Sequence, residues 1–309
     1  MSYTNTMISG VPLESYVMNA SGPKDTNLDE LKDIARSASS AIVMKSATID
    51  YRKGNPEPRY AALPLGSLQS MGLPNLGYKA YIGIADKLKA YGKPIIASVA
   101  GSNIEEYIVM VKEFRDSSVS MIELNMSCPN IEGKSVIGYD TGLVERIIGE
   151  VHDIGDKPIG IKLPPYYDDV QFESLSRIVI DYGIGFITCI NSVPNALYID
   201  PVSESTVIRP KRGFGGLGGS YIKPIALGNV RRFYELLEGK ACIIGVGGIE
   251  SGTDAFEYLI AGADAVQVGT AFDKHGTRVF SDINNELTSI LKDKHYSNIG
   301  QAKGRLKVI

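Results

Sequence analysis

The sequence predicts an α/β protein, most simply a closed barrel of parallel strands surrounded by helices. Eight short runs of apolar and β-branched residues recur along the chain, and each ends in small or polar residues. Helix-length stretches with apolar residues at helical spacing lie between them. Apolar strands that alternate with helices are typical of a parallel sheet covered by helices on its outer face. Because 309 residues suit one barrel-sized domain, we expect residues 1–309 to form a single (β/α)8 TIM barrel.

Each expected strand has a defined place along the chain. The strands are expected at 15–22, 41–48, 94–101, 121–128, 158–165, 185–192, 242–249 and 265–272. Amphipathic helices are expected at 27–38, 77–92, 103–117, 141–155, 169–183 and 251–263. The alternative is a doubly wound open sheet, which would need fewer strands and a glycine-rich turn after the first. The stretch NASGPKD after the first strand is a poor match to that turn.

Three further segments complete the expected barrel. The N-terminal dozen residues, with ISGVP as a turn, are expected to form a short hairpin that closes the barrel floor. The connections at 49–76 and 193–223 are too long for plain loops between a strand and a helix. Because long ordered loops are usually functional, we expect both to lie on the active face of the barrel.

Composition excludes several classes of function. The chain has 32 basic and 35 acidic residues and no long run of either sign, so nucleic acid is not an expected partner. Cys128, Cys189 and Cys242 are far apart and lack the spacing of metal ligands. They are expected to be reduced thiols, without a disulfide framework or a metal site. No segment reads as a signal peptide or membrane span, which predicts a cytoplasmic protein with no membrane association.

Polar residues stand at the carboxyl ends of the expected strands, where a barrel builds its active site. They are Asn19, Ser21, Lys45, Ser46, Asn125, Ser127, Cys128, Lys162, Asn191 and Ser192. The last two strands instead end in glycine-rich turns, GVGGIESG and QVGTAF, that each lead into a helix. Turns of this kind expose backbone N–H groups and favour binding of a phosphate. The run GFGGLGG at 213–219 would add a third set of amides.

Two lysines interrupt apolar strands near their ends. Lys45 and Lys162 would be buried there, where an ammonium group needs a partner. Three interpretations remain open for either residue: a Schiff-base nucleophile, a fixed positive charge that holds an anion, or a structural salt bridge.

The thiol of Cys128 is the candidate for proton transfer. A buried, inert cysteine is the simplest interpretation of this residue taken alone. Its neighbours favour a site, because Asn125 and Asn130 supply amides for a polar planar ligand and Ser127 adds a hydroxyl. No histidine stands at a strand end, so a nucleophile activated by histidine is unsupported.

An ordered series of motifs identifies the family that this chain resembles. They are VMNASGP, VMKSAT, GNPEPRY, LGSLQSMGLPN, ELNMSCPNIEGK, IGIKLPP, INSV, GFGGLGG, VGGIESG and QVGTA. From residue 5 to the C-terminus the chain resembles the dihydroorotate dehydrogenases, FMN-dependent barrels that oxidise dihydroorotate to orotate in pyrimidine synthesis. The cysteine loop, GSLQSMGLPN and the lack of an N-terminal membrane extension resemble the soluble class 1A enzymes, which use fumarate as electron acceptor.

The resemblance implies roles for particular residues. Cys128 would be the general base that takes a proton from C5 of dihydroorotate while a hydride leaves C6 for the flavin N5. Ser127, Lys45 and Lys162 complete the catalytic set, with Lys162 suited to stabilising negative charge on the reduced ring. The loop 129–139 would act as a lid.

The resemblance also implies two sets of contacts. FMN would be bound by Ala20, Ser21, Lys45, Ser46, Asn125, Lys162, Ile190, Gly219, Gly247, Gly248, Gly269 and Thr270. The substrate would be bound by Lys45, Gln69, Ser70, Met71, Gly72, Leu73, Asn125, Asn130, Asn191 and Ser192. Dihydroorotate/orotate and fumarate/succinate would use one pocket in turn, in a homodimer.

The chain departs from the family pattern at three positions. Gln69 replaces the usual asparagine, and Pro194 and Ala196 replace glycines. We expect these changes to alter affinity more than reaction type. Three alternatives differ in function: an NAD-linked relative with an iron–sulfur partner subunit, a Schiff-base lyase that uses Lys162 or Lys45, and a non-catalytic barrel that binds a phosphorylated ligand.

Overall fold

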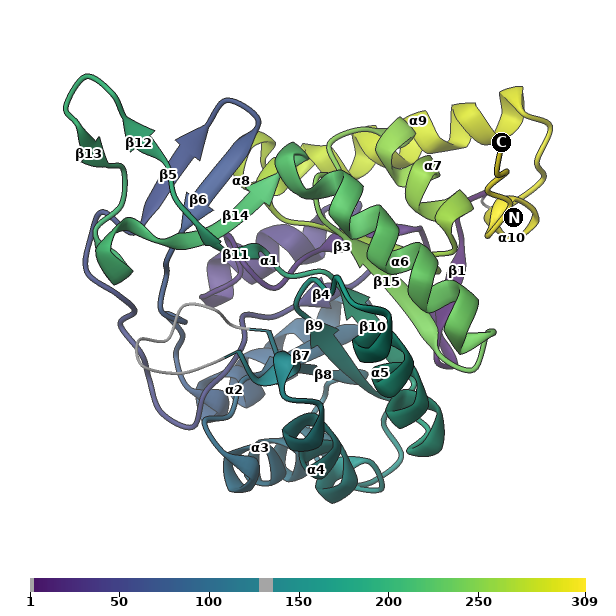
Figure 1. Ribbon diagram of the computed structural model, residues 1–309. Helices are drawn as coiled ribbons and strands as arrows, with labels where there is room; N and C mark the ends of the chain where they lie inside the picture. The colour runs from purple at the N-terminus through teal and green to yellow at the C-terminus, as the bar shows by residue number, and fades with distance from the viewer. Residues whose placement is uncertain (1–2, 128–135) are drawn as a thin grey trace.

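Eight parallel strands form the barrel (Figure 1). The computed structural model describes residues 3–127 and 136–309. The strands are β3 (Val17–Asn19), β4 (Ile42–Val43), β7 (Ile95–Val99), β8 (Met121–Asn125), β9 (Ile159–Leu163), β10 (Phe186–Cys189), β15 (Cys242–Val246) and β16 (Ala265–Val268). Their spatial order is β3-β16-β15-β10-β9-β8-β7-β4. Each lies within one of the eight expected runs, and the predicted (β/α)8 barrel is confirmed.

The junction between β3 and β4 is closed largely by a side chain. Asn19 donates from Nδ2 to the Val43 carbonyl at 2.7 Å, and the Val43 N–H donates to Asn19 Oδ1 at 2.9 Å. A backbone bond from Ser40 N–H to the Val17 carbonyl at 2.9 Å lies beside them. Asn19 is fully buried, so it satisfies both backbone groups of Val43 where water could not. The sequence placed Asn19 among the polar groups of the active face, whereas the structure uses it to close the barrel.

Helices cover the outside of the strands (Figure 1). The longer ones are α1 (Leu28–Arg36), α2 (Tyr78–Leu88), α3 (Ile104–Arg115), α4 (Thr141–Val151), α5 (Asp169–Asp181), α6 (Lys223–Leu237), α7 (Gly252–Ala261) and α9 (Arg278–Asp293). The shorter ones are α8 (Thr270–His275), α10 (Ile299–Ala302) and the 3₁₀ turns η1 (Lys89–Tyr91), η2 (Ile137–Tyr139), η3 (Pro210–Gly213) and η4 (Ser220–Ile222). Capping boxes at Asn27 and Ser251 begin α1 and α7. No described helix is both long and apolar enough to cross a bilayer.

A hairpin closes the barrel floor, as predicted. It consists of β1 (Thr6–Ile8) and β2 (Val11–Leu13). Ile8 and Leu13 are buried in a cluster with Phe186 and other residues at the start of the barrel strands. Because apolar surface is removed from water on both sides of this contact, the hairpin stabilises the end of the barrel opposite the active face.

The two long connections pair with each other in an antiparallel sheet. Its strands are β5 (Tyr60–Leu63), β6 (Gly66–Gln69), β11 (Val193–Ala196) and β14 (Gly215–Gly219), in the order β11-β14-β6-β5. A Cβ atom on Gly66 would lie 2.0 Å from the Gly218 carbonyl oxygen, so glycine permits this close approach. The connection between β11 and β14 carries a further hairpin, β12 (Ile199–Asp200) and β13 (Ser205–Thr206). The sequence predicted both connections on the active face but not their pairing.

Candidate active site

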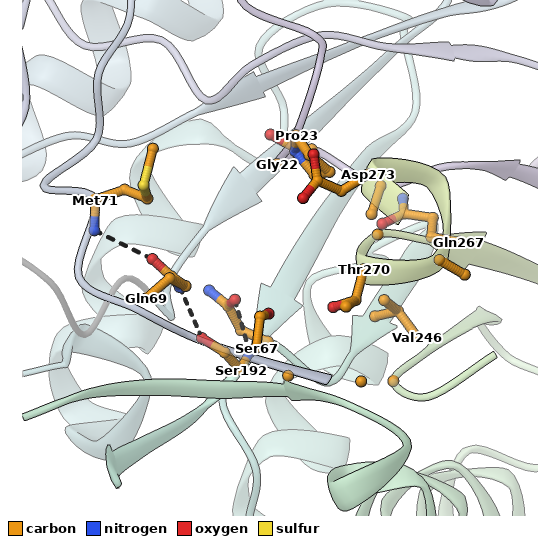
Figure 2. A pocket seen from close by; sticks show the side chains of 18 of the residues that line it. Gly22, Pro23, Ser67, Gln69, Met71, Ser192, Val246, Gln267, Thr270 and Asp273 are labelled. Carbon is orange, nitrogen blue, oxygen red and sulfur yellow. Dashed lines mark hydrogen bonds between the residues drawn. The ribbon is translucent and has the colours of Figure 1, made fainter. Parts of the chain in front are cut away.

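A cavity of about 410 Å³ opens at the carboxyl ends of the barrel strands (Figure 2). Its volume lies within the ~300–1,000 Å³ range of small-molecule sites. Every residue predicted to contact FMN lines it: Ala20, Ser21, Lys45, Ser46, Asn125, Lys162, Ile190, Gly219, Gly247, Gly248, Gly269 and Thr270. The sequence therefore identified residues that the fold brings together from many separate strands.

Most of the predicted substrate contacts lie in the same cavity. Gln69, Met71, Leu73, Asn191 and Ser192 line it. Ser70 and Gly72 belong to the same segment, residues 69–73, but they do not line the cavity. Cys128 and Asn130 lie outside the described residues, as do residues 129–135 of the predicted lid at 129–139.

Three glycine-bearing segments converge at one end of the cavity. A Cβ atom on Gly248 would lie 2.9 Å from the Gly219 carbonyl oxygen, and one on Gly218 would lie 3.1 Å from Thr270 Oγ1. Gly247 and Gly248 have φ values of 136° and 67°, which L side chains rarely adopt. α8 begins at Thr270, and the first N–H groups of a helix have no partner within it. Small residues and available amides suit this end to a phosphate group.

Ser127 fixes two asparagine amides at the edge of the cavity. Its hydroxyl donates to Asn125 Oδ1 at 2.9 Å and accepts from Asn191 Nδ2 at 2.9 Å. Asn125 also donates from Nδ2 to Ser46 Oγ at 3.0 Å. Ser127 is buried and is not a lining residue, so it orients the asparagines rather than presenting its own hydroxyl to the cavity.

Gln69 links the first long connection to the loop after β10. Its Nε2 donates to Ser192 Oγ at 3.2 Å, and its Oε1 accepts from the Met71 N–H at 3.2 Å (Figure 2). Ser192 is further held by its own N–H, which donates to Asn191 Oδ1 at 2.8 Å. The glutamine side chain thus links the strip after β6 to the loop after β10.

Lys45 lies beside a buried carboxyl group that the sequence reasoning missed. Its ammonium donates to the Gly22 carbonyl and lies 3.7 Å from Asp25 Oδ1. The other oxygen, Asp25 Oδ2, accepts from the Gly22 N–H at 2.7 Å. Burial raises the pKa of Asp25 to about 7, although the Lys45 charge acts in the opposite direction. The 3.7 Å separation is too long for a hydrogen bond, so Lys45 offsets only part of the cost of burial.

Lys162 is buried in the barrel and hydrogen bonded to a neutral amide. It is 4% exposed and donates from Nζ to Gln267 Oε1 at 3.3 Å. Burial lowers the pKa of Lys162, and the charge of Glu123 acts in the opposite direction. The sequence reasoning missed both Glu123 and Gln267, although a signal was present, since each is a polar residue inside an apolar strand.

Comparison with known proteins identifies the family. The family model described as "Dihydroorotate dehydrogenase" matches residues 3–291. The chain belongs to the dihydroorotate dehydrogenase family. It is 48% identical over 301 residues to the "Dihydroorotate dehydrogenase (fumarate)" of Kluyveromyces lactis, covering 96% of this chain and 95% of that protein. It is 44% identical over 312 residues to the "Probable dihydroorotate dehydrogenase A (fumarate)" of Streptococcus pneumoniae, covering 100% of both chains.

A solved dihydroorotate dehydrogenase shares the fold. The crystal structure of DHODH in complex with ferulenol from Eimeria tenella superposes with a TM-score of 0.84 at 19% sequence identity. The alignment covers 98% of this chain and 88% of that chain. The predicted resemblance is therefore confirmed by family, relatives and fold.

The residues of the cavity fit the FMN of this dehydrogenase family. The glycine segments around Gly219 and Gly248 leave room that a Cβ atom would occupy, at the end suited to a phosphate. Lys162 supplies a buried ammonium group among the lining residues. Because the chain belongs to a family of flavin dehydrogenases, this site is no longer interpreted as that of a Schiff-base lyase or of a non-catalytic barrel.

Proposed function

We propose that this protein oxidises dihydroorotate to orotate with FMN as cofactor and fumarate as electron acceptor. The observation that carries the proposal is the family match over residues 3–291, with relatives of 44–48% identity whose names specify fumarate. The cavity supports it, because the residues predicted for flavin and for substrate line one space. Both substrates would then use the same pocket in turn.

The chain's own residues would bind and orient the substrate. FMN, when bound, supplies the ring nitrogen that accepts the hydride. Asn125, Asn191 and Ser192 would hold the planar pyrimidine, since all three line the cavity and Ser127 fixes the two amides. Their fixed geometry lowers the entropy cost of placing the reacting carbon over the ring.

Cys128 would be the general base that removes the proton from C5. It follows Ser127, which is buried and hydrogen bonded to both asparagines. A base must lie within hydrogen-bond reach of the proton it removes, and the proposal is supported by Ser127, the preceding residue, which is held between two asparagines that line the cavity. The lid role of loop 129–139 remains part of this proposal.

The two buried lysines would provide fixed positive charge. Lys45 and Lys162 both line the cavity and are at most 8% exposed. Charge that is fixed and shielded from water stabilises a developing anion more strongly than charge in solvent. Lys45 would face substrate and flavin, and Lys162 would stabilise negative charge on the reduced ring.

We also propose that residues 1–309 form one FMN-binding domain, that two copies form a homodimer, and that the protein is cytoplasmic. The β12–β13 hairpin stands away from the barrel (Figure 1). Apolar side chains in and next to it are exposed. Among them are Leu197, Ile199 and Val202, with exposed fractions of 43%, 57% and 92%. Exposed apolar groups of this kind favour a protein contact. Light scattering on the purified protein tests the dimer, and a monomeric mass would contradict it.

An acceptor screen tests the proposed activity. Purified, flavin-loaded protein is assayed with dihydroorotate and fumarate, NAD or a quinone in turn. Fumarate is expected to support the fastest turnover, and Cys128→Ala to abolish most of it. A preference for NAD would instead identify the NAD-linked relative, and turnover equal to background with every acceptor would contradict the proposal.

A further inference from the structure

A chain of polar side chains crosses the interior of the barrel beneath the cavity. It is formed by Glu123, Lys162, Thr188 and Gln267, which come from β8, β9, β10 and β16. All four are buried, with exposed fractions of 0–4%. Such groups are costly inside an apolar core, because each exchanges water for a limited set of protein partners. Their presence in one connected chain requires an explanation other than core packing.

The hydrogen bonds among these four side chains all lead, from donor to acceptor, toward Glu123. Lys162 donates from Nζ to Gln267 Oε1 at 3.3 Å, and Gln267 donates from Nε2 to Glu123 Oε2 at 3.3 Å. Thr188 donates from Oγ1 to the same carboxylate oxygen at 2.8 Å. Gln267 therefore presents its carbonyl to the cation and its amino group to the anion. The amide lies between opposite charges in the orientation that both charges favour.

Glu123 takes no part in the cavity itself. It does not line the cavity, whereas Lys162 and Gln267 do. Its Oε1 is buried and has no hydrogen-bond partner among the described residues. An unsatisfied buried oxygen destabilises the fold, so packing gives no reason for a carboxyl group at this position. The electrostatic effect of Glu123 on Lys162 does give a reason for a carboxyl group at this position.

The charged form of Lys162 is disfavoured by burial and favoured by nearby negative charge. Burial lowers the pKa of Lys162, and Glu123 is the largest of the charges that raise it. Asp25 acts in the same direction as Glu123, and Lys45 acts against both. Glu123 is thus the main group that offsets the burial of the Lys162 charge.

We propose that Glu123 is a positioning residue that acts through the amide of Gln267 to keep Lys162 charged and oriented at the cavity. This inference rests on the proposed function, because Lys162 is assigned there to the reduced flavin ring. Glu123 would contribute to the hydride-transfer step without touching the substrate. Its removal should therefore slow catalysis while substrate affinity stays nearly unchanged.

The test uses Glu123→Gln in the flavin-loaded enzyme. We expect kcat to fall about tenfold to a hundredfold, while KM for dihydroorotate changes less than about twofold. The midpoint potential of the flavin should become more negative, because the reduced ring loses a neighbouring charge. Glu113→Gln, on the exposed face of α3, is the matched control, because it removes one carboxylate that is not part of the buried polar side chains.

A double variant separates the electrostatic role from a packing role. In E123Q/Q267E the carboxylate moves to the position beside Lys162 and an amide takes the place of Glu123. If the charge acts on Lys162, this exchange restores kcat and the potential toward the wild-type values. Q267M, which interrupts the chain but keeps Glu123, should lose activity as E123Q does, and it supplies the test if E123Q does not fold.

A measurement that does not depend on turnover tests the role of Glu123 even if dihydroorotate is not the substrate. Side-chain nitrogen NMR of labelled lysine follows the protonation of Lys162 with pH. The ammonium signal is expected to disappear at a lower pH in E123Q than in wild type, because the variant lacks the charge that favours the ammonium form. Identical lysine titrations in wild type, E123Q and E113Q would overturn the inference. A wild-type protein that dihydroorotate cannot reduce would overturn the proposed function instead.

Discussion

The pH dependence of stability should reveal the buried carboxyl group of Asp25. Its pKa is raised from an ordinary value of 3.8 to about 7, mainly by burial. Between these values the folded protein keeps the proton and the unfolded chain has released it, so stability falls as pH rises. One pH unit corresponds to ~1.36 kcal/mol. Integrated from pH 5 to pH 8, this group alone should lower the free energy of unfolding by about 2.5 kcal/mol.

Asp25→Asn removes this dependence and keeps an oxygen that can accept from the Gly22 N–H. Urea unfolding followed by circular dichroism at pH 5 and pH 8 measures the difference. The wild type should lose about 2.5 kcal/mol more than the variant over this range. Asp29→Asn, at an exposed position in the first turn of α1, is the control and should follow the wild type. Equal pH dependence of wild type and D25N, within about 0.5 kcal/mol, would refute the reasoning.

Three further changes test separate parts of the structure. Asn19→Leu leaves the N–H and carbonyl of Val43 without partners, so the free energy of unfolding in urea should fall by ~2–4 kcal/mol; a loss below about 0.5 kcal/mol would contradict barrel closure by this side chain. Gly248→Ala places a Cβ atom 2.8 Å from the Lys223 Cβ. The variant should bind FMN at least about tenfold more weakly, as measured by flavin fluorescence. Unchanged affinity would contradict the assignment of this end of the cavity to the phosphate. Gln69→Asn breaks the bridge to Ser192, so KM should change severalfold while kcat stays within about twofold; a larger loss of kcat would place Gln69 in the chemistry.

The barrel could be predicted because its signal is local. Each parallel strand is mostly apolar, as Ile95–Val99 and Ile159–Leu163 are apart from Ser98 and Lys162, and each lies between segments of helical period. The residues at the strand ends then meet through the geometry of the fold alone. The strand-end residues Ser21, Lys45, Ser46 and Lys162 accordingly line one cavity, whereas Ala20, Ile190 and Gly219 were expected there only from the family resemblance.

Other features depend on contacts between distant parts of the chain. The pairing of β6 with β14 joins residues 66–69 to residues 216–219, and GGLGG has no strand propensity of its own. The partners of the two lysines were missed for the same reason. Lys162 meets Gln267 and Glu123 only because the strand order of the barrel places their side chains inside it. Asn19 was predicted for the cavity because a polar strand end does not reveal in which direction it points.

Anaerobic mixing of the flavin-loaded protein with dihydroorotate tests the central claim most directly, because it isolates the first half of the reaction. The account predicts that the yellow absorbance bleaches within the time of a turnover and returns on addition of fumarate, and that C128A bleaches far more slowly. A flavin that stays oxidised with dihydroorotate, or that bleaches as fast in C128A as in the wild type, would contradict it.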